Sequence, residues 1–276
     1  MSALVPRWRE NGGRGGSREP LLPTLWRARD LIGFFVLRDL RVRYSQAVLG
    51  VLWVLLQPVA TVVIFTFVFS RLARVGSDGV PYPLFALTGM VAWTYFSGAV
   101  TRGSESLVGN PELVTKVSFP RVAAPAAAVL SPLVDLGVAL SLLAVLLAVY
   151  RRPPGWSVLA APLWLALLLL AAFGTSLWLA ALNVRFRDVK QALGPVLQVW
   201  LFASPVAYPS SALDGGARFL YALNPMVGVI DLARWSLLGA PWPGAPLVVS
   251  VVVVLVVLLT GAAYFSRAQR TFADVI

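Results

Sequence analysis

The chain has 276 residues, of which 58% are hydrophobic and 13% are charged, well below the ~25% charged residues of a typical soluble domain. A water-soluble fold would have too few charged side chains to cover its surface, so a soluble enzyme, a nucleic-acid-binding protein and a disordered chain are excluded. The net charge is +11, and the chain has no Cys and no His. Disulfides, thiolate chemistry, His-ligated metal sites and His-based catalysis are therefore excluded, and an integral membrane protein is indicated.

Six segments meet or approach the ~20 apolar residues that a membrane-spanning helix needs. They are residues 48–70, 84–101, 122–150, 158–182, 191–209 and 246–265. The second segment is short, and the third is interrupted by Pro125, Pro132 and Asp135. The fifth contains Pro195 and Pro205, which predict a broken or kinked helix there.

The basic residues indicate how these spans are oriented. Most of them lie before residue 48 and in the loops that follow the second, fourth and sixth spans. Because positively charged loops stay in the cytoplasm, we expect both termini to be cytoplasmic. The excess of positive charge then sets the topology, and no nucleic-acid partner is expected.

Two segments precede the first span. Residues 1–23 are rich in Arg and Gly and predict a flexible cytoplasmic leader. In residues 24–46, Arg27, Asp30, Arg38 and Arg41 share one side of a helical wheel, which predicts an amphipathic helix along the cytoplasmic leaflet. The alternative is an Arg-rich lead-in that only sets the topology. The six-span region is then 47–266, and residues 267–276 form a cytoplasmic tail.

The loop between the second and third spans carries its own helix signals. Asn110 is a good N-cap, Pro111 suits the first helical position, Glu112 complements the helix dipole and Pro120 stops the helix. A short cytoplasmic helix that docks a partner is one interpretation, and a simple connector is the other.

The stretch after the fifth span is too long and too apolar for a simple outer loop. Asn224 and Pro225 again have the pattern of an N-cap and a first helical residue, and Asp231 and Arg234 lie one turn apart and could pair. Two short re-entrant helices are predicted here, because such backbone is tolerated in a bilayer only where protein shields it. The residues that mark this region are Pro205, Tyr208, Asn224 and Pro225.

The sequence lacks the groups of an ATPase or a membrane enzyme. It has no G-x-x-x-x-G-K-[ST] phosphate loop, so we expect no ATP hydrolysis by that route. Because it also lacks His, Cys and a carboxylate cluster within the spans, we expect no metal site and no bound cofactor in this chain. Asp135 is the one ionisable residue predicted deep in a span, where a charge costs ~2.5–3.5 kcal/mol. No intramembrane Arg, Lys or Glu is expected to match it. It is either a transport site or a structural Asp that is hydrogen-bonded or protonated.

Aromatic side chains are the remaining functional candidates. Trp53, Trp93, Tyr95 and Phe96 belong to an interfacial aromatic belt or line a wide channel where their rings stack on sugars. Gln57, next to a proline in the first span, is either a polar group at a kink or a pore-lining residue.

Taken together, several motifs spread over residues 30–270 resemble the polysaccharide-exporting ABC-2 type permeases, which export O-antigen, teichoic acid and related cell-envelope glycans. The motifs are Leu37–Tyr44, Leu49–Trp53, Gln57–Pro58, Pro81–Pro83, Trp93–Phe96, Gly109–Arg121, Leu182–Asp188, Ser204–Val206 and Asn224–Met226. The resemblance implies an all-α membrane fold with an interfacial helix, six spans, a cytoplasmic coupling helix and re-entrant helices before the last span. It also implies a homodimer in the bacterial inner membrane with two separate ATPase subunits, which bind ATP and Mg.

The resemblance also implies roles for particular residues. The coupling helix that contacts the ATPase would include Asn110, Pro111, Glu112, Leu113, Val114, Lys116, Phe119 and Arg121. The second cytoplasmic loop would contribute Arg185, Arg187 and Asp188. Arg38, Arg41 and Arg43 would steer the pyrophosphate of a polyprenyl-linked glycan, since Arg pairs well with phosphate oxygens. The alternatives are an ABC-2 exporter of a small drug or lipid, and a membrane scaffold that transports nothing.

Overall fold

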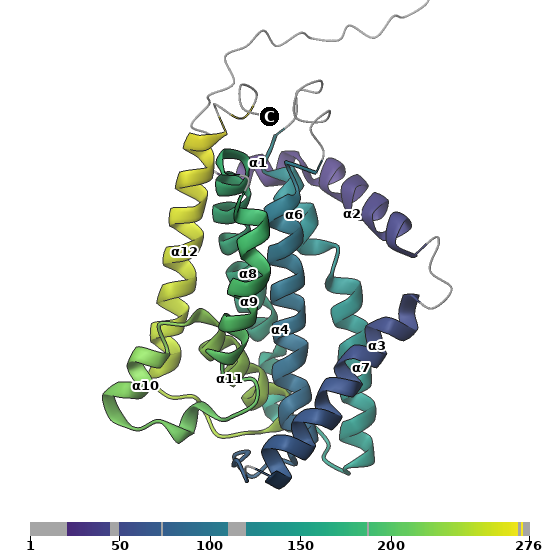
Figure 1. The fold of residues 1–276 in the computed structure, drawn as a ribbon, viewed down its shortest axis with the longest axis vertical. Helices are drawn as coiled ribbons and strands as arrows, with labels where there is room; N and C mark the ends of the chain where they lie inside the picture. The colour runs from purple at the N-terminus through teal and green to yellow at the C-terminus, as the bar shows by residue number, and fades with distance from the viewer. Residues whose placement is uncertain are drawn as a thin grey trace, which may run out of the picture.

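The computed structural model describes residues 21–44, 50–72, 74–109, 120–186, 188–269 and 272, and these residues contain helices and no strand. Four of the helical segments are long and apolar enough to cross a membrane. They are α4 (Tyr82–Glu105), the interrupted pair α6 (Ala123–Leu130) and α7 (Leu133–Val149), α8 (Ala161–Arg185) with the 3-10 turn Trp156–Ala160 before it, and α12 (Pro246–Ala268). They run roughly along the long axis of the molecule (Figure 1), and the predicted all-α membrane fold is confirmed.

The first and fifth predicted spans are less regular. The first is α3 (Gly50–Phe65), which continues as a π-helix over Thr66–Leu72. The fifth is α9 (Asp188–Phe202), whose 15 residues extend ~22 Å, less than the ~30 Å hydrocarbon core. The break predicted in segment 191–209 is confirmed near Pro205, which disfavours helix in the residue before it, and residues 203–208 form turns and bends. Pro195, by contrast, lies inside α9.

Prolines and polar residues decide the other boundaries. Pro132 separates α6 from α7 as predicted, whereas Pro125 lies in the first turn of α6, where its missing N–H is tolerated. The second span is longer than predicted, because α4 continues through the polar turn that ends at Glu105.

The predicted amphipathic segment is helical. It consists of α1 (Leu21–Arg27) and α2 (Arg29–Tyr44). Ile32 and Phe35 of α2 pack with Ala28 against the alanines of α6. This contact holds α2 obliquely across one end of the bundle (Figure 1), the end at which α12 finishes. Its position on a membrane surface remains a prediction.

Two helices, α10 (Gly215–Tyr221) and α11 (Pro225–Leu238), lie at the opposite end of the molecule (Figure 1). Asn224 caps α11, since its Oδ1 accepts a hydrogen bond from the Met226 amide at 3.0 Å. Both predicted helices are therefore present, although their depth in a bilayer remains a prediction. The proposed Asp231–Arg234 pair is wrong: the Arg234 Nη2 donates to the carbonyl oxygen of Val206 at 2.8 Å, and Asp231 accepts from Ser210.

Candidate functional site

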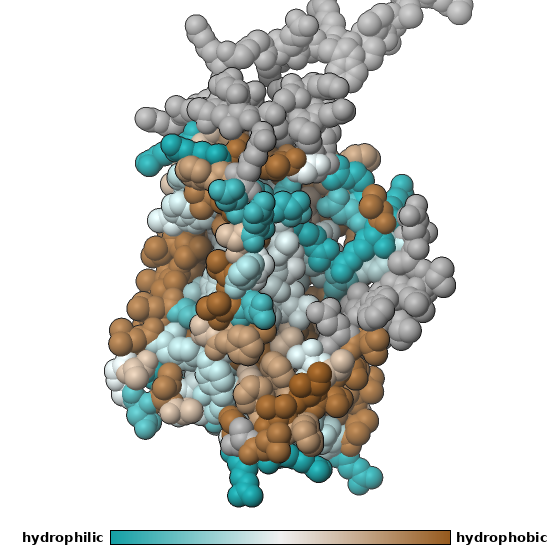
Figure 2. All heavy atoms as spheres, viewed as in Figure 1, coloured by the Kyte–Doolittle hydropathy of each residue, from teal (hydrophilic) through white to brown (hydrophobic). Residues whose placement is uncertain are grey.

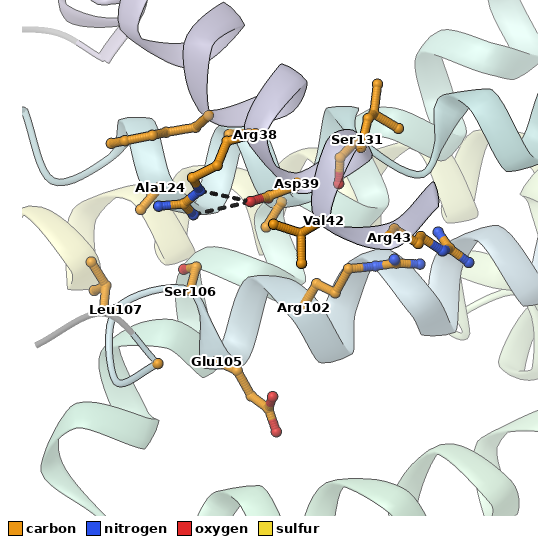
Figure 3. Close-up of a pocket in the computed structure, with 15 residues that line it drawn as sticks. Arg38, Asp39, Val42, Arg43, Arg102, Glu105, Ser106, Leu107, Ala124 and Ser131 are labelled. Carbon is orange, nitrogen blue, oxygen red and sulfur yellow. Dashed lines mark hydrogen bonds and ion pairs between the residues drawn. The ribbon is translucent and has the colours of Figure 1, made fainter. Parts of the chain in front are cut away.

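A pocket of about 700 Å³ lies between α2, the C-terminal end of α4 and α6. Its volume falls within the range of ~300–1,000 Å³ that is usual for ligand sites. Figure 3 shows the charged side chains of α2 and α4 gathered around it. The charged residues that line it are Arg38, Asp39, Arg43, Arg102 and Glu105, and apolar walls come from residues such as Phe35, Val42, Leu107 and Ala127.

Two of the charged residues that line the pocket form ion pairs with neighbouring side chains. Arg38 is paired with its neighbour Asp39 at 3.0 Å. Glu105 is paired outside the pocket, with Lys190 of α9 at 3.3 Å.

Asp135 at the start of α7 has partners that the sequence did not predict. Arg43 and Tyr44 both donate hydrogen bonds to its carboxylate, and the Arg102 Nη2 lies 3.8 Å from its Oδ2. Burial, followed by the hydrogen bond to Asp135, raises the pKa of Tyr44 above its ordinary value. The expectation that no basic residue matches Asp135 is wrong, and the structural interpretation of this residue, hydrogen-bonded to another helix, agrees with the geometry.

The structure brings together two of the three arginines predicted to steer pyrophosphate. Arg38 and Arg43 line the pocket, whereas Arg41 is exposed and is not among its lining residues. The sequence did not predict Arg102 as a site residue, because a basic residue near the cytoplasmic end of a span is already explained by the orientation of the spans. Only the fold shows that it shares one carboxylate with Arg43.

The aromatic residues singled out in the sequence for a belt or a channel lie in the core of the chain. Trp93, Tyr95 and Phe96 are almost fully buried, and the Tyr95 hydroxyl donates to the carbonyl oxygen of Val129 at 2.7 Å. Trp93 and Phe96 also pack edge-to-face on Trp200 of α9. Their burial argues against the channel alternative, and the interfacial-belt alternative remains a prediction. Trp53 and Gln57 belong to α3, but their side chains lie outside the described part of the chain.

The opposite face of α4 carries a polar stripe, which we define as Thr94, Ser97, Gly98, Thr101, Arg102 and Glu105. Thr94 is exposed and the other members are partly exposed. The hydroxyl of Thr101 donates to the Ser97 carbonyl oxygen at 2.8 Å, so it is satisfied within the helix. From Glu105 in the pocket to Thr94 the stripe spans ~16 Å along the helix axis. Figure 2 shows teal and pale atoms over α4, α9 and α2 in the upper middle of this face, with brown atoms over α12.

The predicted ATPase contacts are only partly described. Residues 110–119 of the coupling segment lie outside the described residues, as does Arg187. Arg121, at the end of that segment, donates to the carbonyl oxygen of Gln269, and its guanidinium lies 5.9 Å from the ring centre of Phe272. It therefore contacts the C-terminal end of the chain. Arg185 and Asp188 are exposed at the α8–α9 junction.

The predicted re-entrant residues form a connected cluster at the other end of the bundle. Pro205 is buried, and the Tyr208 hydroxyl donates to the Phe202 carbonyl oxygen at 2.7 Å. Asn224 also accepts a hydrogen bond from the Trp200 indole at 2.9 Å. The cap of α11 is thereby tied to α9 and to the aromatic rings of α4.

Fold and pocket together define a multi-pass α-helical membrane protein with a cationic pocket at one end. Residues 31–238 match the ABC-2 type transporter family. An O-antigen export system permease protein, RfbA, of Myxococcus xanthus is 32% identical over 93% of this chain and 99% of its own length. The protein of the same name from Klebsiella pneumoniae is 24% identical over 90% and 95%, and the polysialic acid transport protein KpsM of Escherichia coli is 24% identical over 85% and 92%. The chain belongs to the ABC-2 type transporter family, and its resemblance to the polysaccharide-exporting permeases is confirmed.

Proposed function

We propose that this protein is the permease subunit of an ATP-driven exporter that moves a polyprenyl-pyrophosphate-linked polysaccharide from the cytoplasmic to the outer side of the bacterial inner membrane. The observation that carries this proposal is the cationic pocket, which is continuous along α4 with a polar stripe. The relatives named for O-antigen and polysialic acid transport support a glycan as the cargo.

The pocket and the stripe suit the two chemically different parts of such a substrate. Guanidinium groups form bidentate, charge-assisted hydrogen bonds with phosphate oxygens, so Arg38, Arg43 and Arg102 bind the pyrophosphate. The hydroxyls of the stripe present small polar contacts to a sugar chain as it passes. Contacts of this kind select weakly, which suits a polymer whose successive units must slide past the same residues.

The proposed assembly contains two copies of this chain, two ATPase subunits and surrounding lipid. A second copy facing α4 and α9 would enclose the stripe, which otherwise faces apolar lipid at an energetic cost. The sequence has no phosphate loop, so ATP and Mg bind on the ATPase, and residues 110–119 transmit its motion. Both α1 and the end of α12 lie at the pocket end of the molecule, which supports cytoplasmic termini (Figure 1).

Depletion of the protein from its host cell tests this function. We expect one lipid-linked glycan to accumulate on the cytoplasmic face of the membrane while the corresponding surface glycan disappears. Loss of drug resistance or of a small secreted lipid, with the surface glycans unchanged, would instead support a small-molecule exporter. A normal surface and no accumulated intermediate would contradict export altogether.

A further inference from the structure

We infer that Asp135 is an internal counter-ion that a diphosphate displaces, so that arrival of the substrate headgroup releases the C-terminal end of α2 from α7. This inference rests on the proposed function and assigns a regulatory step to the same pocket.

The first observation is that one carboxylate is shared by two cations. Arg43 of α2 donates to Asp135 Oδ2, and the Arg102 Nη2 of α4 lies 3.8 Å from the same oxygen. Within the described residues, neither arginine has a second carboxylate at ion-pair distance. The group of three therefore keeps one positive charge in excess, which favours the binding of a further anion.

The second observation is where these groups lie relative to the pocket. Both arginines line it, with 36% and 37% of their side chains exposed, whereas Asp135 is only 16% exposed and does not line it. An anion in the pocket reaches the guanidinium groups from the open side. Because a diphosphate carries more charge and more acceptor oxygens than a carboxylate, it competes with Asp135 for the same donors.

The third observation is what the contact with Asp135 holds in place. Arg43 and Tyr44 are the last two residues of α2, and both are bonded to Asp135, about 90 residues further along the chain. The N-terminal part of α2 is held separately, through Ile32 and Phe35 against α6. Displacement of Asp135 from Arg43 leaves the Tyr44 hydrogen bond as the remaining contact with Asp135, so it loosens only the end of α2 that leads toward α3. A ligand shifts such an equilibrium only when it binds one state better, and here the diphosphate needs Arg43 released from Asp135.

Binding of inorganic pyrophosphate to the purified chain in lipid nanodiscs, measured by calorimetry, tests the competition. We expect Asp135→Asn to bind several-fold more tightly than the wild type. Asp30→Asn is the matched control, since it makes the same change of charge on an α2 side chain that is 93% exposed, and it should leave the affinity unchanged. Unchanged or weaker binding by Asp135→Asn, or equally tighter binding by Asp30→Asn, would overturn the inference. Tighter binding of a short polyprenyl diphosphate than of pyrophosphate would support a lipid headgroup as the ligand, and equal binding would overturn that assignment.

Release of α2 needs a separate readout. The chain has no Cys, so Arg41→Cys provides a single labelling site on the exposed side of α2. We expect pyrophosphate to lower the fluorescence anisotropy of a label there, and Asp135→Asn to lower it without ligand. If Asp135→Asn does not fold, Arg43→Gln removes the α2 cation for which the diphosphate and Asp135 compete, so pyrophosphate should no longer change the anisotropy of the label. A pyrophosphate response retained in Arg43→Gln would overturn the inference.

These measurements need neither the ATPase nor export, so the two proposals fail separately. Absence of glycan accumulation on depletion, with the anisotropy response intact, would contradict the proposed function alone.

Discussion

At the scale of single residues, the bundle depends on two glycines where α8 crosses α12. A Cβ atom at Gly174 would lie 2.7 Å from the Leu258 Cα, and one at Gly261 would lie 2.6 Å from the Gly174 carbonyl oxygen. At both positions the added methyl group would meet backbone atoms, which cannot move aside as a flexible side chain can. Small residues at helix crossings are the usual means by which membrane helices approach closely.

Gly174→Ala should therefore destabilise the protein by ~1–3 kcal/mol, the usual cost of overpacking a core. The measurement is the midpoint of thermal unfolding in detergent. Gly137→Ala on α7 is the matched control, because a Cβ there has no neighbour within 4 Å and alanine favours helix over glycine. Equal unfolding midpoints for the two variants would contradict this account of the α8–α12 contact.

At the scale of elements, α4 has two faces with different roles. Its aromatic face, with Trp93 and Phe96, packs on α9, while the polar stripe from Thr94 to Glu105 faces away from the core. The hydroxyl residues of the stripe, Thr94, Ser97 and Thr101, are spaced three and four apart, which is a helical period in the sequence.

Cysteine accessibility should distinguish the two faces of α4. In a chain without native Cys, we expect Thr94→Cys and Thr101→Cys to react with a water-soluble thiol reagent in membranes that contain the complete transporter. Ala99→Cys, on the buried face of the same helix, should stay unreactive. Similar labelling at all three positions, or labelling of Ala99→Cys alone, would argue against a hydrated path along the stripe.

A second element is the C-terminal part of the chain around Phe272. Phe272 is buried with Leu107, Val122 and Phe265 in one cluster, so the residues that flank segment 110–119 on both sides pack against it. We expect Phe272→Ala to loosen the link between ATP hydrolysis and export. The amount of glycan exported per ATP hydrolysed should fall several-fold.

Phe219→Ala, which truncates a partly exposed phenylalanine on α10 at the other end of the molecule, is the control for this change. The control should keep the wild-type ratio. A wild-type ratio in Phe272→Ala as well would show that the tail has no part in coupling.

At the scale of the whole molecule, hydropathy predicted the membrane class and the four helices that are long enough to span a bilayer. Pro132 predicted the break before α7, and Asn224 with Pro225 predicted the start of α11. Hydropathy could not show that α9 ends at Phe202, because the turn that follows is as apolar as a helix. It also could not show which apolar face meets protein and which meets lipid, so an interfacial belt and a channel lining both stayed open for Trp93, Tyr95 and Phe96, whose rings the fold buries in the core. The pairing of Asp135 with Arg43 and Arg102 depends on three elements far apart in the chain, and no local pattern encodes it.

The central claim is that this chain moves a lipid-linked polysaccharide, and reconstitution tests it most directly. The permease and its ATPase would be placed in proteoliposomes that carry a polyprenyl-pyrophosphate-linked glycan in the outer leaflet, on the side of the ATPase. We predict that Mg-ATP makes the glycan inaccessible to an external glycosidase, and that Arg43→Gln together with Arg102→Gln slows this transfer. ATP hydrolysis with the glycan still fully exposed to the glycosidase would contradict the claim.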